Sequence, residues 1–287
     1  MDALANVNGE TLPLAELKIS ALDRGFLFGD AVYEVLRVYQ GKPWLEEEHF
    51  RRLAHSLEAI RIAGVDLGRL RRRVHETIAA GPFGEALVYI QVTRGAAPRR
   101  THAWPADLAP LELLWVDEFH DPYAEQRRAG AAVISQPDVR WDRCDIKSTN
   151  LLANILAMQS AAEAECLEAL FYLPDGTVTE GTHTSFFGVL GGAVLTAPNS
   201  NAILPGITRS LVLRLAQRAG VAVREETLTR DDLGRVSELF LTGTTSEVLP
   251  VVRVDGRPIA DGRPGPVSRR LQEAYREAVR EFVGGRG

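Results

Sequence analysis

The stretch from Ala31 to Ile62 constrains the fold most, because two different periodicities follow each other along it. Residues 31–39 alternate between the two faces of a strand, and Gln40-Gly41-Lys42 has the composition of a tight turn into a second short strand. Apolar side chains then recur at helical spacing over residues 46–62, at Phe50, Leu53, Ala54, Leu57 and Ile60. A hairpin followed directly by an amphipathic helix predicts a domain of the α+β class.

The rest of the chain divides into a smaller and a larger region. A second helix over about 67–80 and strands at 86–93 and 111–117 complete the first region. The polar segment His120-Asp121-Pro122-Tyr123 interrupts the pattern, and several strands and three helices follow it. We therefore expect a small N-terminal domain over residues 1–119, a linker over 120–125 and a larger, β-rich domain over 126–287.

The composition of the 287 residues excludes several classes of protein. The net charge of -5 gives no general attraction to nucleic acid or to an anionic membrane. No segment approaches the ~18 uncharged apolar residues of a membrane span, and the N-terminus lacks the pattern of a signal peptide. Two cysteines imply no disulfide framework. We expect a cytoplasmic protein that binds neither nucleic acid nor membrane and needs no metal.

Lys147 is the strongest candidate for chemistry. It ends the polar loop Asp142–Ile146 and stands before an apolar helix over 151–165, for which Asn150 is a candidate N-cap. The positive end of a helix dipole disfavours a charged lysine there and favours the neutral amine, which attacks a carbonyl to form a Schiff base. The alternative is a surface lysine near a helix cap.

Glu180 is the second candidate, in the loop Thr179–Ser185. It follows a short strand and precedes Gly181, so its carboxylate is expected to be held at a strand end. It could be an ordinary glutamate at the rim of a hairpin. Beside a pyridine ring, however, a carboxylate has a definite task, because it keeps the ring nitrogen protonated.

Two turns have the composition of phosphate sites. Pro205-Gly206-Ile207-Thr208 opens a helix, whose first N–H groups and dipole attract anions. Gly243-Thr244-Thr245 offers a second set of hydroxyl and backbone donors, and Arg52 on the first helix could supply the countercharge. The alternatives are capping by Thr208, a simple turn at Gly243 and a solvated helix face around Arg52.

Taken together, these segments resemble the class IV, fold-type IV pyridoxal-phosphate enzymes. That family includes D-amino acid and branched-chain aminotransferases, (R)-amine transaminases and aminodeoxychorismate lyases. The resemblance covers nearly the whole chain and depends on the joint order and spacing of residues 23–25, 28–34, 143–148, 179–181, 206–209 and 244–247. It implies a small N-terminal α/β domain and a larger C-terminal pseudo-barrel β domain with flanking helices.

The resemblance also implies a role for each matching residue. Lys147 would bind pyridoxal 5'-phosphate as the internal aldimine and move the substrate proton, and Glu180 would pair with the pyridine nitrogen. Leu204 would pack on the cofactor ring. The phosphate would be held by Arg52, Ile207, Thr208 and Thr244.

Among the family members, the sequence is most similar to the D-amino acid aminotransferases. Tyr33-Glu34-Val35 and the segment from Val92 to His102 carry this similarity. In those enzymes a tyrosine, an arginine and a histidine bind the substrate α-carboxylate, the last two from the partner subunit. Tyr33 and His102 match this pattern. The family loop has Pro-Arg, one residue and then His, whereas Pro98-Arg99-Arg100-Thr101-His102 contains one residue more. Either Arg99 or Arg100 therefore takes the role of the arginine.

We therefore expect a ping-pong transaminase that acts on D-amino acids such as D-alanine or D-glutamate and on 2-oxo acids. The resemblance further implies a homodimer. A branched-chain L-amino acid or (R)-amine transaminase is the alternative, and an aminodeoxychorismate lyase fits the carboxylate-binding set less well. A pyridoxal-phosphate carrier without activity would leave Lys147 and Glu180 without a catalytic task.

Overall fold

The computed structural model describes residues 3–285 and groups them into two compact units. The first unit contains the chain up to His120 together with Ile146–Asn150, and the second contains Asp121–Asp145 and the chain from Leu151 onward. The boundary thus falls inside the segment expected as a linker, and α4 (Ala124–Ala129) already begins within that segment. Residues 146–150, which the sequence placed in the second domain, belong with the first.

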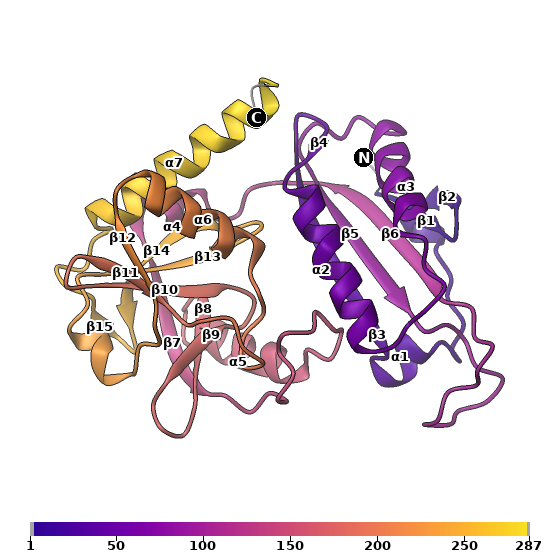
Figure 1. Cartoon of the computed structure of the whole chain (residues 1–287), viewed down its shortest axis with the longest axis horizontal. Helices are drawn as coiled ribbons and strands as arrows, with labels where there is room; N and C mark the ends of the chain where they lie inside the picture. Colours follow the sequence, from indigo (N-terminus) through magenta and orange to yellow (C-terminus); the bar gives the residue numbers. More distant parts are fainter. Residues whose placement is uncertain (1–2, 286–287) are drawn as a thin grey trace. The chain divides into compact units, whose positions relative to one another are not determined.

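A six-stranded antiparallel sheet forms the first unit, in the order β2-β1-β6-β5-β3-β4. Its strands are β1 (Leu4–Val7), β2 (Glu10–Pro13), β3 (Ala31–Tyr39), β4 (Lys42–Pro43), β5 (Ala86–Thr93) and β6 (Leu111–Glu118). Helices α2 (Glu46–Ala59) and α3 (Leu67–Ala79) pack on one face of it, as Figure 1 shows. A 3-10 turn (Leu14–Glu16) and the short α1 (Arg24–Phe28) complete the unit.

The alternation along β3 decides which side chains enter the core of the first unit. Val32 and Leu36 are fully buried against Phe50 and Leu53 of α2, while Tyr33 points to the other face of the sheet and is half-buried. Glu34 shares the buried face with the apolar residues. A charged residue in that position requires partners, and α2 provides them.

The second unit is built on a nine-stranded mixed sheet in the order β12-β11-β10-β13-β14-β7-β8-β9, with β15 paired to β14. Its strands are β7 (Ala131–Pro137), β8 (Glu168–Tyr172), β9 (Val178–Gly181), β10 (Ser185–Leu190), β11 (Ala193–Thr196), β12 (Ala222–Glu225), β13 (Glu238–Gly243), β14 (Glu247–Val254) and β15 (Arg257–Pro258). The end strand β9 continues directly into β10, and Gly181 N–H donates to Thr184 O across the connection. This sheet therefore curls back on itself, and the predicted α+β class with a barrel-like second domain is confirmed.

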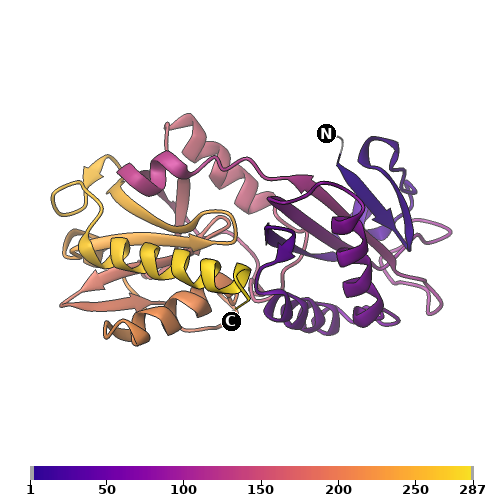
Figure 2. The same cartoon turned by 90° about the horizontal axis from the view of Figure 1, so that it is seen from above.

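Helices cover this curled sheet from two sides. The helices α6 (Ile207–Arg218) and α7 (Pro266–Val283) contact each other and lie against β13 and β14, whereas α5 (Leu152–Glu163) packs against β7 and β8 on the opposite side (Figure 2). A 3-10 turn (Asp231–Gly234) precedes β13. Glu238 anchors α7, because its carboxylate accepts the N–H groups of Val267 and Ser268 at 2.8 Å each. Within residues 3–285 no helix has both the length and the apolar character needed to cross a membrane.

Candidate active site

Lys147 is fixed in the first unit by backbone pairing with β3. Its carbonyl accepts the N–H of Tyr33 at 2.9 Å, Ser148 forms a bridge with Val32, and its own N–H donates to Ser56 Oγ of α2 at 3.2 Å. The Lys147 Nζ lies 4.2 Å from the centroid of the Tyr33 ring, within the range of a cation–π contact. The lysine and the tyrosine that the sequence selected are therefore neighbours.

The structure corrects the expectation that Lys147 lies at a helix start. Helix α5 begins at Leu152, with Leu151 as its N-cap, and Lys147 belongs to the other compact unit. Asn150, expected as the cap, instead donates from Nδ2 to Gly29 O at 3.0 Å. The helix-dipole argument for Lys147 was wrong, because pairing with a distant strand rather than the following helix sets its surroundings.

Arg52 forms a buried ion pair with Glu34. Its Nε donates to Glu34 Oε1 at 2.7 Å and its Nη2 donates to Oε2 at 2.9 Å, and His49 Nδ1 lies 2.7 Å from the same Oε2. Burial alone would raise the pKa of Glu34. The charge and hydrogen bonds of Arg52, together with the weaker effects of His49, instead hold that pKa far below its usual value. Glu34 thus orients Arg52, whose contact with a phosphate stays a prediction.

Tyr33 heads a stack of aromatic rings on the sheet face opposite α2. Its ring lies 5.6 Å from that of Tyr89, which in turn lies 3.9 Å from Trp115. Burial raises the pKa of the Tyr89 hydroxyl, whose oxygen is 2.7 Å from Gln91 Oε1. Tyr33 is thereby held in place by its neighbours on β5 and β6.

The loop that carries the substrate-binding candidates is tied to α1. Arg24 donates to the carbonyls of Thr101 and His102 at 2.7 and 2.9 Å, and its Nε binds Asp30. Asp30 also binds Arg94. The Arg24 guanidinium is almost fully buried, so it fixes the path of this loop.

The two candidate arginines of this loop differ in their surroundings. Arg100 lies with its guanidinium carbon 5.0 Å from the centre of the Phe28 ring, and His102 packs edge-on to the same ring at 5.6 Å. Arg99 is exposed and forms no hydrogen bond or ion pair with the described part of the chain. The structure therefore brings Arg100 and His102 together and leaves Arg99 apart.

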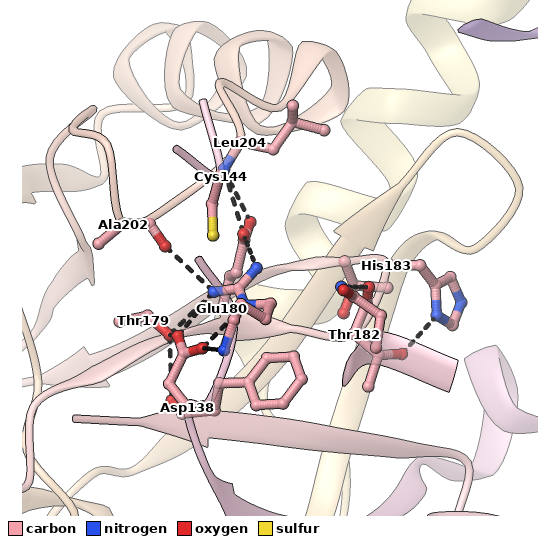
Figure 3. A network of polar contacts seen from close by, with 12 residues as sticks. Asp138, Cys144, Thr179, Glu180, Thr182, His183, Ala202 and Leu204 are labelled. Carbon is pink, nitrogen blue, oxygen red and sulfur yellow. Dashed lines mark hydrogen bonds and ion pairs between the residues drawn. The ribbon is translucent and has the colours of Figure 1, made fainter. Parts of the chain in front are cut away.

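Glu180 lies in the second unit, buried at the end of β9, with Arg140 as its main partner (Figure 3). Arg140 Nη1 donates to Glu180 Oε1 at 2.5 Å, and the Leu204 N–H is 3.1 Å from both carboxylate oxygens. Burial raises the pKa of Glu180 to about 7, against the opposing effects of Arg140 and the Leu204 N–H. The sequence reasoning missed Arg140, because one arginine after a strand carries no motif.

A second buried carboxylate shapes the turn that follows Glu180. Glu168 accepts hydrogen bonds from the hydroxyls of Thr182 at 2.5 Å and Thr184 at 2.9 Å, and it pairs with His183. Burial would raise its pKa, but the His183 charge and the hydrogen bonds hold it at about 2. Glu168 therefore stays ionised and sets the short connection from β9 to β10.

The start of α6 meets β10 at Ser185. The helix has Gly206 as its N-cap and no side-chain cap, so Thr208 lies inside the first turn and is not the capping residue considered above. A Cβ on Gly206 would overlap Ser185 Oγ, which shows how closely the backbone approaches. Ser185 pairs with Thr242 of β13. The first turn of α6 and the end of β13 therefore both lie next to Ser185 at the start of β10.

Two buried hydroxyls near this point have no hydrogen-bond partner among the described residues, those of Thr242 and Ser246. Both residues flank the turn that contains Thr244, and a Cβ on Gly243 would lie 2.7 Å from Ser246 Oγ. Unpaired buried hydroxyls are costly, so they indicate a missing polar partner. Ser185, Thr242 and Ser246 were not found from sequence, since single hydroxyl residues in strands are common.

Comparison with known proteins decides the family. The model of amino-transferase class IV matches residues 31–254, most of the chain. This protein is a class IV aminotransferase. The family that was inferred from residues 23–25, 28–34, 143–148, 179–181, 206–209 and 244–247 is thereby confirmed.

Relatives of this class IV aminotransferase match over almost their full length. The D-alanine aminotransferase of Bacillus licheniformis is 38% identical over 95% of both chains, and that of Staphylococcus haemolyticus is 36% identical over 95% of this chain and 96% of its own. Among solved structures, the branched-chain aminotransferase of Thermoproteus uzoniensis gives a TM-score of 0.87. It is 25% identical and is matched over 100% of this chain and 96% of its own.

Class IV aminotransferases use pyridoxal 5'-phosphate, and the described residues suit it. The unsatisfied hydroxyls of Thr242 and Ser246 beside an uncapped helix start form a donor set for a phosphate. Glu180 is a buried carboxylate of the kind that pairs with a pyridine N–H. Lys147 adds a primary amine. The described residues therefore include each type of group that the cofactor requires: donors for its phosphate, a carboxylate for its ring nitrogen and an amine for its aldehyde.

Gly206→Ala tests whether the start of α6 holds the phosphate. The added methyl group must push Ser185 Oγ away, so we expect the affinity for pyridoxal phosphate to fall at least ~10-fold, or about 1.4 kcal/mol. Fluorescence titration of the cofactor-free protein measures this. Gly234→Ala is the matched control, because no atom lies within 4 Å of its added methyl group. Equal affinity of both variants would contradict the assignment.

Proposed function

We propose that this class IV aminotransferase moves an amino group between a D-amino acid, such as D-alanine or D-glutamate, and a 2-oxo acid in a ping-pong reaction. The choice of donor is supported by the D-alanine aminotransferases, which are 35–38% identical over 95% of the chain. The branched-chain enzymes among the similar solved structures are 24–29% identical. Branched-chain L-amino acids and (R)-amines are the alternative donors.

The environment of Lys147 is the observation that carries the catalytic assignment. The chain has three lysines, and both Lys18 and Lys42 are exposed. Lys147 alone is half-buried, with its backbone fixed to β3 and α2 and its Nζ over Tyr33. A covalently bound cofactor needs an amine in a defined position. We therefore assign this role to Lys147.

Pyridoxal phosphate, when bound, supplies a protonated ring that withdraws electrons from the substrate α-carbon. The Lys147 amine takes the α-proton on Nζ and returns it, as general acid–base catalysis by one positioned group requires. Glu180 accepts the ring N–H and thereby keeps the ring protonated. Ile207 and Thr208 at the start of α6, together with Thr244 and Arg52, bind the phosphate, and Leu204 packs on the ring.

The substrate α-carboxylate binds to Tyr33, Arg100 and His102 in this proposal. Arg100 is preferred over Arg99, because it shares the Phe28 ring with His102, whereas Arg99 has no partner among the described residues. A guanidinium can bind a carboxylate through two parallel hydrogen bonds. The extra residue in the loop is then accommodated before Arg100.

A second copy of the chain is the partner that we infer for α5. Leu152, Ile155 and Leu156 lie three and four positions apart on this helix and are 71%, 59% and 61% exposed. Such an apolar stripe is typical of an interface. A homodimer is also the arrangement in which the loop with Arg100 and His102 serves the partner's substrate. Two free cysteines agree with a cytoplasmic location.

Lys147→Ala tests the catalytic amine and the choice of donor. With added pyridoxal phosphate, the unaltered protein should convert D-alanine and 2-oxoglutarate to pyruvate and glutamate, faster than it uses L-leucine or (R)-1-phenylethylamine. The variant should be at least ~10³-fold slower, because the proton at the α-carbon loses its acceptor. Pyruvate formation is the measurement, and Lys18→Ala is the control. Faster turnover of L-leucine would favour the branched-chain alternative, and release of pyruvate from aminodeoxychorismate would favour the lyase.

Arg100→Ala and Arg99→Ala form a matched pair. Loss of a charge-assisted hydrogen bond costs about 1.5–3 kcal/mol, so we expect KM for D-alanine to rise ~10- to 100-fold in Arg100→Ala. Arg99→Ala should stay within about twofold. Steady-state kinetics give both values. A larger effect at Arg99 would reverse the assignment.

Leu156→Asp tests whether two copies of the chain associate through α5. A charge in an apolar interface is costly to bury, so the variant should sediment as a single 31.5 kDa chain, whereas the unaltered protein should have twice that mass. Gln217→Asp places the same charge on an exposed polar position of α6 and should leave the mass unchanged. A monomeric unaltered protein would refute the proposed dimer.

A further inference from the structure

Arg140 is held rigidly by contacts on all sides of its guanidinium. Its Nε and Nη2 bind Asp138 Oδ1 and Oδ2 at 2.9 and 2.8 Å, and Nη2 also donates to Ala202 O at 3.1 Å. The guanidinium carbon lies 4.6 Å from the centre of the Phe171 ring. Only 6% of the side chain is exposed. With these groups fixed, Nη1 is directed to Glu180.

The two oxygens of Glu180 are used unequally. Oε1 accepts from Arg140 Nη1 and shares the Leu204 N–H, whereas Oε2 has only that shared N–H among the described residues (Figure 3). A carboxylate oxygen has about two acceptor positions. Oε2 therefore keeps the capacity to accept one more hydrogen bond, although the carboxylate is buried.

Arg140 is the cation that opposes the neutralisation of Glu180. Burial favours the uncharged acid, the nearby Asp138 does the same, and Arg140 and the Leu204 N–H oppose them, so that the pKa of Glu180 stands at about 7. The Cys144 thiol close to this group stays neutral, because burial raises its pKa to about 11. Without Arg140, a carboxylate in these surroundings would take up a proton.

We propose that Arg140 is a positioning residue that keeps the Glu180 carboxylate ionised and leaves its Oε2 for the ring N–H of pyridoxal phosphate. This inference rests on the proposed function, because it requires Glu180 to pair with the ring nitrogen. Arginine suits the task because its charge keeps Glu180 ionised and its planar fork binds Asp138 and Glu180 at the same time, whereas the ammonium of lysine would supply the charge without the fork. Arg140 acts on the cofactor only through Glu180.

The protonation of the ring nitrogen is the direct readout. The protein is loaded with ¹⁵N-labelled pyridoxal phosphate, and the nitrogen resonance reports whether the ring is protonated. In Arg140→Gln the resonance should move to the unprotonated position, because Glu180 is then neutral. In Arg140→Lys, which keeps the charge but loses the fork, the ring should stay protonated. The dissociation constant of the cofactor should rise in both variants by about 10- to 100-fold, the size of effect that follows when a group orienting a metal ligand is removed.

Controls separate this inference from the proposed function. Arg235→Gln removes an exposed arginine of the same unit, 72% exposed and paired with Asp232, and should change neither measurement. If Glu180→Gln leaves the ring protonated as in the unaltered protein, the role proposed for Glu180 fails. If Glu180→Gln removes the ring proton but Arg140→Gln does not, only the role of Arg140 fails. Should Arg140→Gln not fold, Arg140→Lys decides, because an unprotonated ring in that variant also refutes the proposal.

Discussion

Three carboxyl groups that the fold removes from water determine how the site regions are built. Glu34 and Glu180 are each paired with an arginine, Arg52 and Arg140, and Glu168 is surrounded by hydroxyl and N–H donors. An unpaired buried charge is strongly unfavourable, so each carboxylate fixes the elements that supply its partners. In the first unit this joins β3 to α2, and in the second it orders the strand end and turn that carry Glu180.

The charges around Glu180 match the cofactor of the family. Asp138 and Glu180 are two acids with one cation, Arg140, between them, and hydrogen bonds from Arg140 keep the pKa of Asp138 low despite its burial. When Glu180 is ionised, these three groups together carry one negative charge in excess, which a protonated pyridine ring would neutralise. The hydroxyls of Thr242 and Ser246, which have no partner among the described residues, would likewise be satisfied by donating hydrogen bonds to a phosphate. In both regions, polar atoms can form hydrogen bonds beyond those that they make with the described residues.

Periodicity predicted most of the elements, since local side-chain spacing decides them. The strands 31–39 and 86–93 occur with the expected bounds, and the helix expected over 67–80 is observed at 67–79. The short helices α1 and α4 were not expected, because five or six residues give no periodic signal. The surroundings of Lys147 were predicted wrongly, because the adjacent helix was taken as its neighbour. Its backbone pairs with β3, more than a hundred residues earlier.

The sequence by itself determined the family, the candidate lysine and carboxylate and the turns suited to phosphate, because each depends on residue type and local order. Only the tertiary structure decided that Lys147 belongs with β3 and α2, that Arg140 holds Glu180, and that Gly206 lies against Ser185. It also distinguished Arg100 from Arg99, because Arg100 and His102 contact the same Phe28 ring. These contacts join residues far apart in the chain, and their energies depend on burial and direction, which no local pattern encodes.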